Sequence, residues 1–126
     1  ILRLLSEIQL MGEYACIVID ADFSLSKESL KLYREAQDIV LVSDGSELAN
    51  SKLKRAYEAL SIMEQNADAP LINRMSLMYN KVSSKTGQTA EVQGLKELGG
   101  APKYERATTQ QILAQLAPME LFDKIF

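Results

Sequence analysis

Residues 36–60, AQDIVLVSDGSELANSKLKRAYEAL, join a short apolar run to a polar turn and then to a long amphipathic stretch. The run 39–42 has the length and the β-branched content of a strand that is buried on both faces, as in a parallel sheet. Ser46 can then cap a helix that extends to about residue 65. The apolar side of this helix is predicted to contain Leu53, Ala56, Tyr57, Leu60 and Met63. The order of strand, turn and helix predicts an α/β fold.

Two further apolar runs, 15–19 (ACIVI) and 76–79 (SLMY), have the length of buried strands. Between the first of them and residue 39, Ser26 can cap a helix over 27–36 with Leu30, Tyr33 and Ala36 on its inner side. Alternation of strand and helix indicates a three-layer fold, in which helices flank a mostly parallel sheet. The sequence therefore predicts strands at 15–20, 38–43 and 76–80, with 46–65 as the longest helix.

The remaining segments are predicted from spacing and from turn residues. Residues 1–11 have apolar positions at helical spacing and end near Gly12, whereas 81–90 are polar and loop-like. A short helix is predicted over 91–98, closed by Gly99 and Gly100, and an extended piece over 101–105. A last helix begins at Thr108 or Thr109, and a final turn follows over 119–126.

Composition limits the functional classes. A chain of 126 residues, 47% apolar and 25% charged, suits one soluble domain or a fragment of one. The net charge of −3 makes nucleic acid an unfavoured partner, although it does not exclude one. Histidine is absent, which removes His-based triads and most zinc sites. Cys16 is the only cysteine, which fits a cytoplasmic location, and no apolar run is long enough to span a membrane.

Polar side chains follow each predicted strand. Since the carboxyl ends of parallel strands meet at one edge, these residues are expected along one rim, where α/β proteins bind ligands. Carboxylates suit Mg²⁺, and an amide offers the donor and acceptor that can read the edge of a purine. The simpler alternative is that they only end the strands with soluble turn-forming side chains. The candidate rim residues are Asp20, Asp22, Ser43, Asp44, Asn80 and Lys81.

Four sequence segments, in the same order along the chain, resemble segments of the MinD/ParA group of P-loop ATPases. YACIVIDADFSL (14–25) resembles the strand that ends in the metal-side aspartate, and residues 36–60 resemble the strand and long helix that follow. MSLMYNKV (75–82) is similar to the strand that ends in the adenine-binding asparagine. LGGAPKYE (98–105) is similar to the later segment that carries a proline beside the base. The resemblance extends over nearly the whole chain from Tyr14 onward.

The resemblance implies roles for individual residues. Asp20 would be the metal-side carboxylate, Asn80 the base-reading amide, and Pro102 a neighbour of the base. ATP and Mg²⁺ are then the expected ligands of the parent protein, and an ATP-dependent dimer is its expected assembly. The chain departs from the family in two ways. Where the family usually has a DTPP-like sequence, this chain has Asp20-Ala21-Asp22-Phe23. No G-x-x-x-x-G-K-[ST] phosphate-binding loop occurs in the sequence.

The missing phosphate-binding loop leads us to expect half of a nucleotide-binding domain, with ATP hydrolysis only if the parent protein supplies that loop upstream. Four other interpretations remain open. Asp20 and Asp22 also resemble the nucleophile and acid/base of haloacid-dehalogenase-like phosphotransferases, with Ser43 ending their second strand motif. A nucleotide-sugar transferase, a receiver domain and a non-catalytic binding or scaffold module of the same fold are the others.

Overall fold

The computed structural model describes residues 1–83, 92, 94–123 and 125. Contacts between residues divide the chain into two compact units, Ile1–Ala36 and Gln37–Phe126. The larger unit contains all the strands in the described part of the chain.

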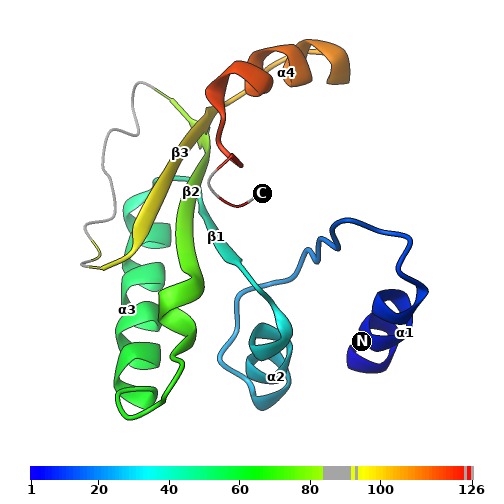
Figure 1. Cartoon of the computed structure of the whole chain (residues 1–126). Coiled ribbons are helices and arrows are strands. Elements are labelled where there is room, and N and C mark those ends of the chain that lie inside the picture. The colour runs from blue at the N-terminus through cyan, green and yellow to red at the C-terminus, as the bar shows by residue number, and fades with distance from the viewer. Residues whose placement is uncertain (84–91, 93, 124, 126) are drawn as a thin grey trace. The chain divides into compact units, whose positions relative to one another are not determined.

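The larger unit is built on a three-stranded parallel sheet (Figure 1). Its strands are β1 (Ile39–Ser43), β2 (Met75–Val82) and β3 (Lys96–Pro102), and they lie side by side in sequence order. The strands predicted at 38–43 and 76–80 are confirmed. The α/β class is confirmed as well, in the form of a small parallel sheet flanked by helices.

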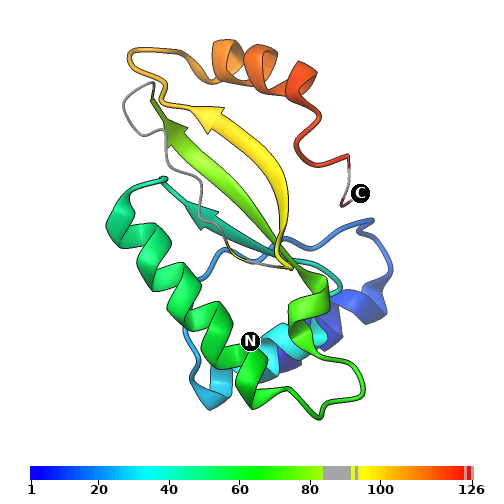
Figure 2. The ribbon, with the colours of Figure 1, turned by 90° about the vertical axis from the view of Figure 1, so that its left-hand side faces the viewer.

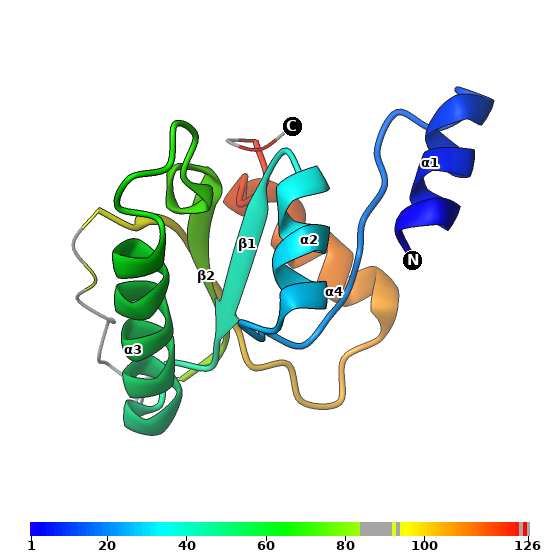
Figure 3. The same cartoon turned by 90° about the horizontal axis from the view of Figure 1, so that it is seen from below.

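Helix α3 (Glu47–Met63) connects β1 to β2 and runs along one face of the sheet (Figures 2 and 3). In β1 and β2 the residues alternate, so that Leu41 and its register partner Leu77 are buried on the same face. Leu60 of α3 is completely buried. Ser46 accepts a hydrogen bond from the Ala49 amide, which confirms the predicted N-cap. The predicted burial of Met63 is wrong, because the last turn of α3 leaves this side chain exposed.

Two short elements and one helix complete the larger unit. The 3-10 helix η1 (Leu71–Arg74) precedes β2, and the buried carboxylate of Glu64 accepts a hydrogen bond from the Leu71 amide at 2.7 Å. Helix α4 (Thr109–Leu116) begins at a capping box formed by Thr108 and Gln111, which confirms its predicted start. The 3-10 helix η2 (Ala117–Met119) follows directly.

The prediction of a helix over 91–98 is wrong for its described part, because residues 96–98 belong to β3. Residues 84–91 and 93, and with them most of the predicted loop 81–90, lie outside the described residues. Gly99 does not end a helix. It lies inside β3 at φ 129°, and a Cβ atom there would be 2.8 Å from Cδ2 of the buried Leu121. Packing against a distant segment therefore overrides the local pattern.

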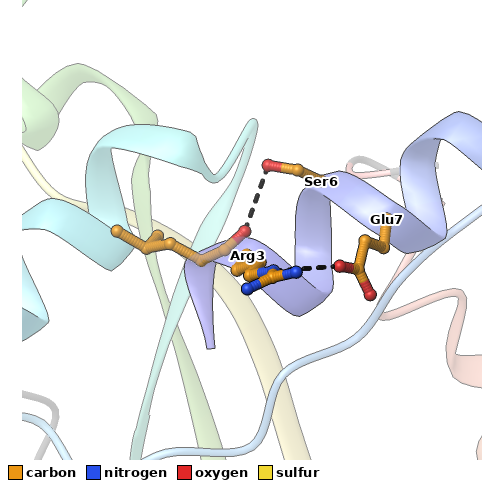
Figure 4. A network of polar contacts seen from close by, with 4 residues as sticks. Arg3, Ser6 and Glu7 are labelled. Carbon is orange, nitrogen blue, oxygen red and sulfur yellow. Dashed lines mark hydrogen bonds and ion pairs between the residues drawn. The ribbon is translucent and has the colours of Figure 1, made fainter.

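The smaller unit contains α1 (Leu2–Met11) and α2 (Lys27–Glu35), both as predicted from the sequence. Exposed side-chain contacts in α1 join Arg3 Nε to Glu7 Oε1 at 3.1 Å and the Ser6 hydroxyl to the Leu2 carbonyl (Figure 4). Ser26 caps α2 by accepting a hydrogen bond from the Ser29 amide. Among the described residues, no helix is both long and apolar enough to cross a membrane.

The strand predicted at 15–20 is not formed. These residues have no regular secondary structure, Val18 is 81% exposed, and Cys16, which an apolar strand would bury, is also exposed. An extended segment becomes a strand only when a neighbouring strand pairs with its N–H and C=O groups. Residues 1–36 contain no strand that could pair with this segment, so its strand-like composition alone does not produce a strand within the smaller unit.

Replacing Gly99 with alanine should lower the free energy of unfolding by about 1–3 kcal/mol, because the positive φ and the nearby Leu121 both oppose a Cβ atom. Urea titration measures this loss. In a Leu121→Ala background the same substitution should cost less, since the clash is removed. An equal cost in both backgrounds would contradict the role assigned to this contact.

Candidate functional site at the carboxyl ends of the strands

The carboxyl end of β1 lies beside the last residues of β2. Ser43 ends β1 and is the register partner of Tyr79, so Asp44 in the following turn lies next to Asn80, while β2 continues to Val82. Lys81 comes next, and its positive charge acts on the Asp44 carboxylate. The pairing of β1 with β2 therefore brings Asp44, Asn80 and Lys81 near one another, and a ligand-binding role for these residues stays a prediction.

Pro102 lies on the same rim, at the end of β3. It is the register partner of Val82, and the amide of the following residue, Lys103, donates a hydrogen bond to the Val82 carbonyl at 3.2 Å. Its half-buried ring therefore lies one strand away from the end of β2 that carries Asn80. The nearby Tyr104 hydroxyl is buried without a hydrogen-bond partner among the described residues.

Hydrogen bonds of the Ser43 side chain connect the turn after β1 to the first turns of α3. Ser43 is only 4% exposed, and its hydroxyl donates to Asn50 Oδ1 at 2.9 Å while accepting from the Gly45 amide at 3.1 Å. The Asn50 amide group donates in turn to the Gly45 carbonyl at 3.4 Å. Gly45 has a positive φ of 77°, which suits glycine. Ser43 is thus a structural residue of the rim, and Asn50 is a member of this network that the sequence did not suggest.

Asp44 is exposed, and its side chain stabilises the same turn by a hydrogen bond. Its Oδ1 accepts a hydrogen bond from the Ser46 amide at 2.9 Å. Hydrogen bonds from the side chain and backbone of Ser46 lower the pKa of Asp44 below its usual value, and the positive charge of Lys81 acts in the same direction. Asp44 therefore keeps a negative charge at the rim down to acid pH.

Asn80 and Lys81 form an irregular step at the end of β2. Asn80 is exposed, and its Oδ1 accepts a hydrogen bond from the Lys81 amide at 2.9 Å. Lys81 has a positive φ of 60°, which is uncommon for a residue with a side chain. The register between β2 and β3 shifts at this step, between Tyr79 and Val82. The carboxamide of Asn80 is thus held in one orientation at the rim.

Asp20 and Asp22 belong to the smaller unit and not to the sheet that carries the other candidates. Both are exposed in the irregular segment between α1 and α2. The strand that Asp20 was expected to end is not formed, so the strand-end argument no longer positions this carboxylate. Its proposed role rests on the sequence resemblance alone.

The available ligands limit the kind of metal that this chain can bind. Within the described ranges, no three His, Cys, Asp or Glu side chains gather closely enough to hold a metal ion. Mg²⁺ commonly takes only one or two carboxylates and completes its octahedron with water and substrate phosphates, so the Mg²⁺ that the resemblance implies stays a prediction.

A shallow pocket opens at the other end of the sheet, where the strands begin. Its lining includes Asp38, Arg74, Ser76 and Lys96, so it carries charges of both signs. Parallel α/β sheets bind ligands at the carboxyl ends of their strands, because loops and helix N-termini converge there. For this reason the rim, and not this pocket, is the stronger candidate.

Comparisons with known proteins do not assign the chain to a family. No protein-family model matches it, and no curated protein matches it at a significant level.

Ser43→Ala should lower the free energy of unfolding by about 1–3 kcal/mol, because it leaves the Gly45 amide and Asn50 Oδ1 without their buried partner. Chemical denaturation measures the change. Ser46→Ala, which removes the N-cap of α3, gives a reference value of about 1 kcal/mol for a local loss. A Ser43→Ala variant as stable as the wild type would show that the network does not hold the turn.

Asp44→Asn should destabilise the chain at neutral pH and have a smaller effect in acid. The folded-state pKa of Asp44 is lowered, so its charge contributes stability above the unfolded pKa of about 3.9 and loses this contribution as pH falls through the folded pKa. Asparagine keeps the acceptor for the Ser46 amide and removes only the charge. Urea unfolding at neutral and acid pH tests this, and Asp68→Asn in an exposed loop corrects for net charge. A difference that grows in acid would contradict the assignment.

Proposed function

We propose that this chain is part of the ATP-binding domain of a MinD/ParA-like P-loop ATPase, a cytoplasmic protein that acts in positioning or partitioning. It would contribute the base side and the metal side of the nucleotide site. The phosphate-binding loop has no counterpart in these 126 residues and would come from outside them. The proposal rests on the sequence resemblance and on one structural observation, the exposed amide of Asn80 at the carboxyl end of a parallel strand.

The surroundings of Asn80 suit a base-reading role. Its carboxamide is exposed, lies on the rim where such sheets bind ligands, and is fixed by the Lys81 amide before any ligand arrives. A pre-oriented polar group loses less conformational freedom on binding than a mobile one. Pro102, one strand away, offers an apolar surface of the kind that can border a base.

Energetics limit what this part of the site achieves alone. Asn80 can form one or two hydrogen bonds to a base, each worth about 0.5–1.5 kcal/mol net. Association costs several kcal/mol of translational and rotational freedom. Most affinity for a nucleoside triphosphate in P-loop proteins comes from backbone N–H groups and a lysine around the phosphates. The chain by itself should therefore bind ATP only at millimolar concentration and should not hydrolyse it.

Asp20 supplies the carboxylate on the metal side in this proposal. A lone carboxylate repels a triphosphate, but it can hold Mg²⁺ directly or through water once the phosphates bring the ion. In the parent protein, Asp20 and Mg²⁺ would then support hydrolysis, and ATP would favour a dimer. Asp22 lies two residues later and is not assigned to the metal.

A second candidate is a binding or scaffold module of the same fold without catalysis. One observation favours it over a haloacid-dehalogenase-like reaction: the Ser43 hydroxyl is already hydrogen-bonded within the protein. That chemistry needs the strand-ending hydroxyl free to bind a phosphate.

Calorimetric titration with MgATP separates these possibilities. The 126-residue chain should show no binding below millimolar concentration, whereas the protein extended upstream through its phosphate-binding loop should bind and hydrolyse ATP. In that longer protein, Asp20→Asn should weaken hydrolysis and its Mg²⁺ dependence more than the matched Asp22→Asn does. Micromolar binding by the 126-residue chain, or equal effects of the two variants, would contradict the proposal. A longer protein that neither contains such a loop nor binds ATP would favour the scaffold module.

A further inference from the structure

The end of β2 contains a β-bulge. Tyr79 is the register partner of Gly100 and Val82 that of Pro102, so three steps along β2 oppose two along β3. Lys81 lies within this interval at φ 60°. A left-handed residue at this point accommodates the extra position and lets the strand rejoin the ladder at Val82. Such bulges often redirect side chains beside functional sites.

The bulge has a direct effect on Asn80. It frees the Lys81 amide from the ladder, and that amide donates instead to Asn80 Oδ1 at 2.9 Å. A backbone N–H can only donate, so the oxygen of the carboxamide, and not its NH₂ group, must face the Lys81 amide. The hydrogen bond reaches the oxygen from the Cβ side, because it closes a ring through the backbone of Asn80. Among the described residues, no hydrogen-bond partner is found for the outer edge, which carries the NH₂ group and the second lone pair of the oxygen.

This outer edge has a donor and an acceptor side by side. Adenine offers the matching pair, an acceptor at N7 and a donor at its 6-amino group, whereas a 6-oxo purine presents two acceptors at N7 and O6. We propose that Lys81 is a positioning residue whose left-handed backbone, and not its charge, holds Asn80 ready to select 6-amino over 6-oxo purines. This inference rests on the proposed nucleotide-binding function.

The charge of Lys81 supplies the competing explanation. Lys81 is close enough to influence Asp44, so its ammonium group could instead act by attracting phosphate or by orienting the carboxylate. Substitutions at position 81 separate the two effects. Glycine and asparagine both remove the charge and both tolerate a positive φ, whereas valine removes the charge and strongly disfavours that conformation. Asparagine and valine are therefore a matched pair of uncharged variants.

The test uses the 126-residue chain, labelled with ¹⁵N, as the wild type and as Lys81→Gly, Lys81→Asn and Lys81→Val. Adenosine and inosine monophosphates are titrated to millimolar concentration, because they differ only at and beside position 6 of the purine. The Asn80 side-chain NH₂ signal reports binding of the base. The temperature dependence of the amide proton at position 81 reports the hydrogen bond to Asn80 without any nucleotide.

The wild type, Lys81→Gly and Lys81→Asn should prefer the adenine nucleotide by roughly 2- to 10-fold, the value of one hydrogen bond. Lys81→Val should lose this preference and the position-81 hydrogen bond, while amide signals elsewhere in the sheet stay unchanged. If Lys81→Gly and Lys81→Asn lose the preference for adenine, or if Lys81→Val keeps it, the inference about Lys81 is wrong. Neither result would contradict the proposed function. A wild type whose rim responds to neither nucleotide would overturn the proposed function and the selectivity together.

Discussion

Parallel pairing of β1 with β2 is the constraint on which the larger unit depends. Five consecutive residues of β1 pair in unbroken register with β2, from Ile39 opposite Met75 to Ser43 opposite Tyr79. Parallel strands cannot be joined by a tight turn, so the chain must return along the sheet, and α3 provides that crossover. The same register ends β1 beside Tyr79, three residues before the end of β2. The turn after β1 and the bulge of β2 are therefore neighbours, and the positive charge of Lys81 acts on the Asp44 carboxylate between them.

Local signals in the sequence predicted those parts of the fold that local interactions determine. The apolar run at 39–42 and the caps at Ser26, Ser46 and Thr108 correspond to elements that are observed. Two segments were predicted wrongly because their conformation depends on distant partners. Gly99 resembles the end of a helix but pairs with Met78 inside the sheet, close to the distant Leu121. Residues 15–20 resemble a strand but find no strand to pair with inside the smaller unit.

The candidate site divides in a similar way. Strand ends follow from the sequence, so the gathering of Asp44, Asn80 and Lys81 on one rim was predictable once the strands were known to be parallel. The hydrogen bonds that give these residues different tasks were not predictable. The Ser43 hydroxyl is hydrogen-bonded to Asn50 and Gly45 inside the turn, whereas the Asn80 carboxamide is bound by the Lys81 amide on one side and has no partner on its outer edge in the described part of the chain. Neither hydrogen-bonding arrangement can be recognised from the sequence, because each depends on which backbone N–H groups near the strand ends are left without a backbone partner.

We propose that ligands bind at the carboxyl ends of the strands and not in the pocket where the strands begin. Amide chemical-shift mapping of the 126-residue chain with millimolar MgATP tests this most directly, because it reports both ends of the sheet in one experiment. We expect the largest changes at Asp44, Asn80 and Lys81, and little change at Asp38, Arg74 and Lys96. Changes confined to Asp38, Arg74 and Lys96 would contradict it and would place the site at the opposite end of the sheet.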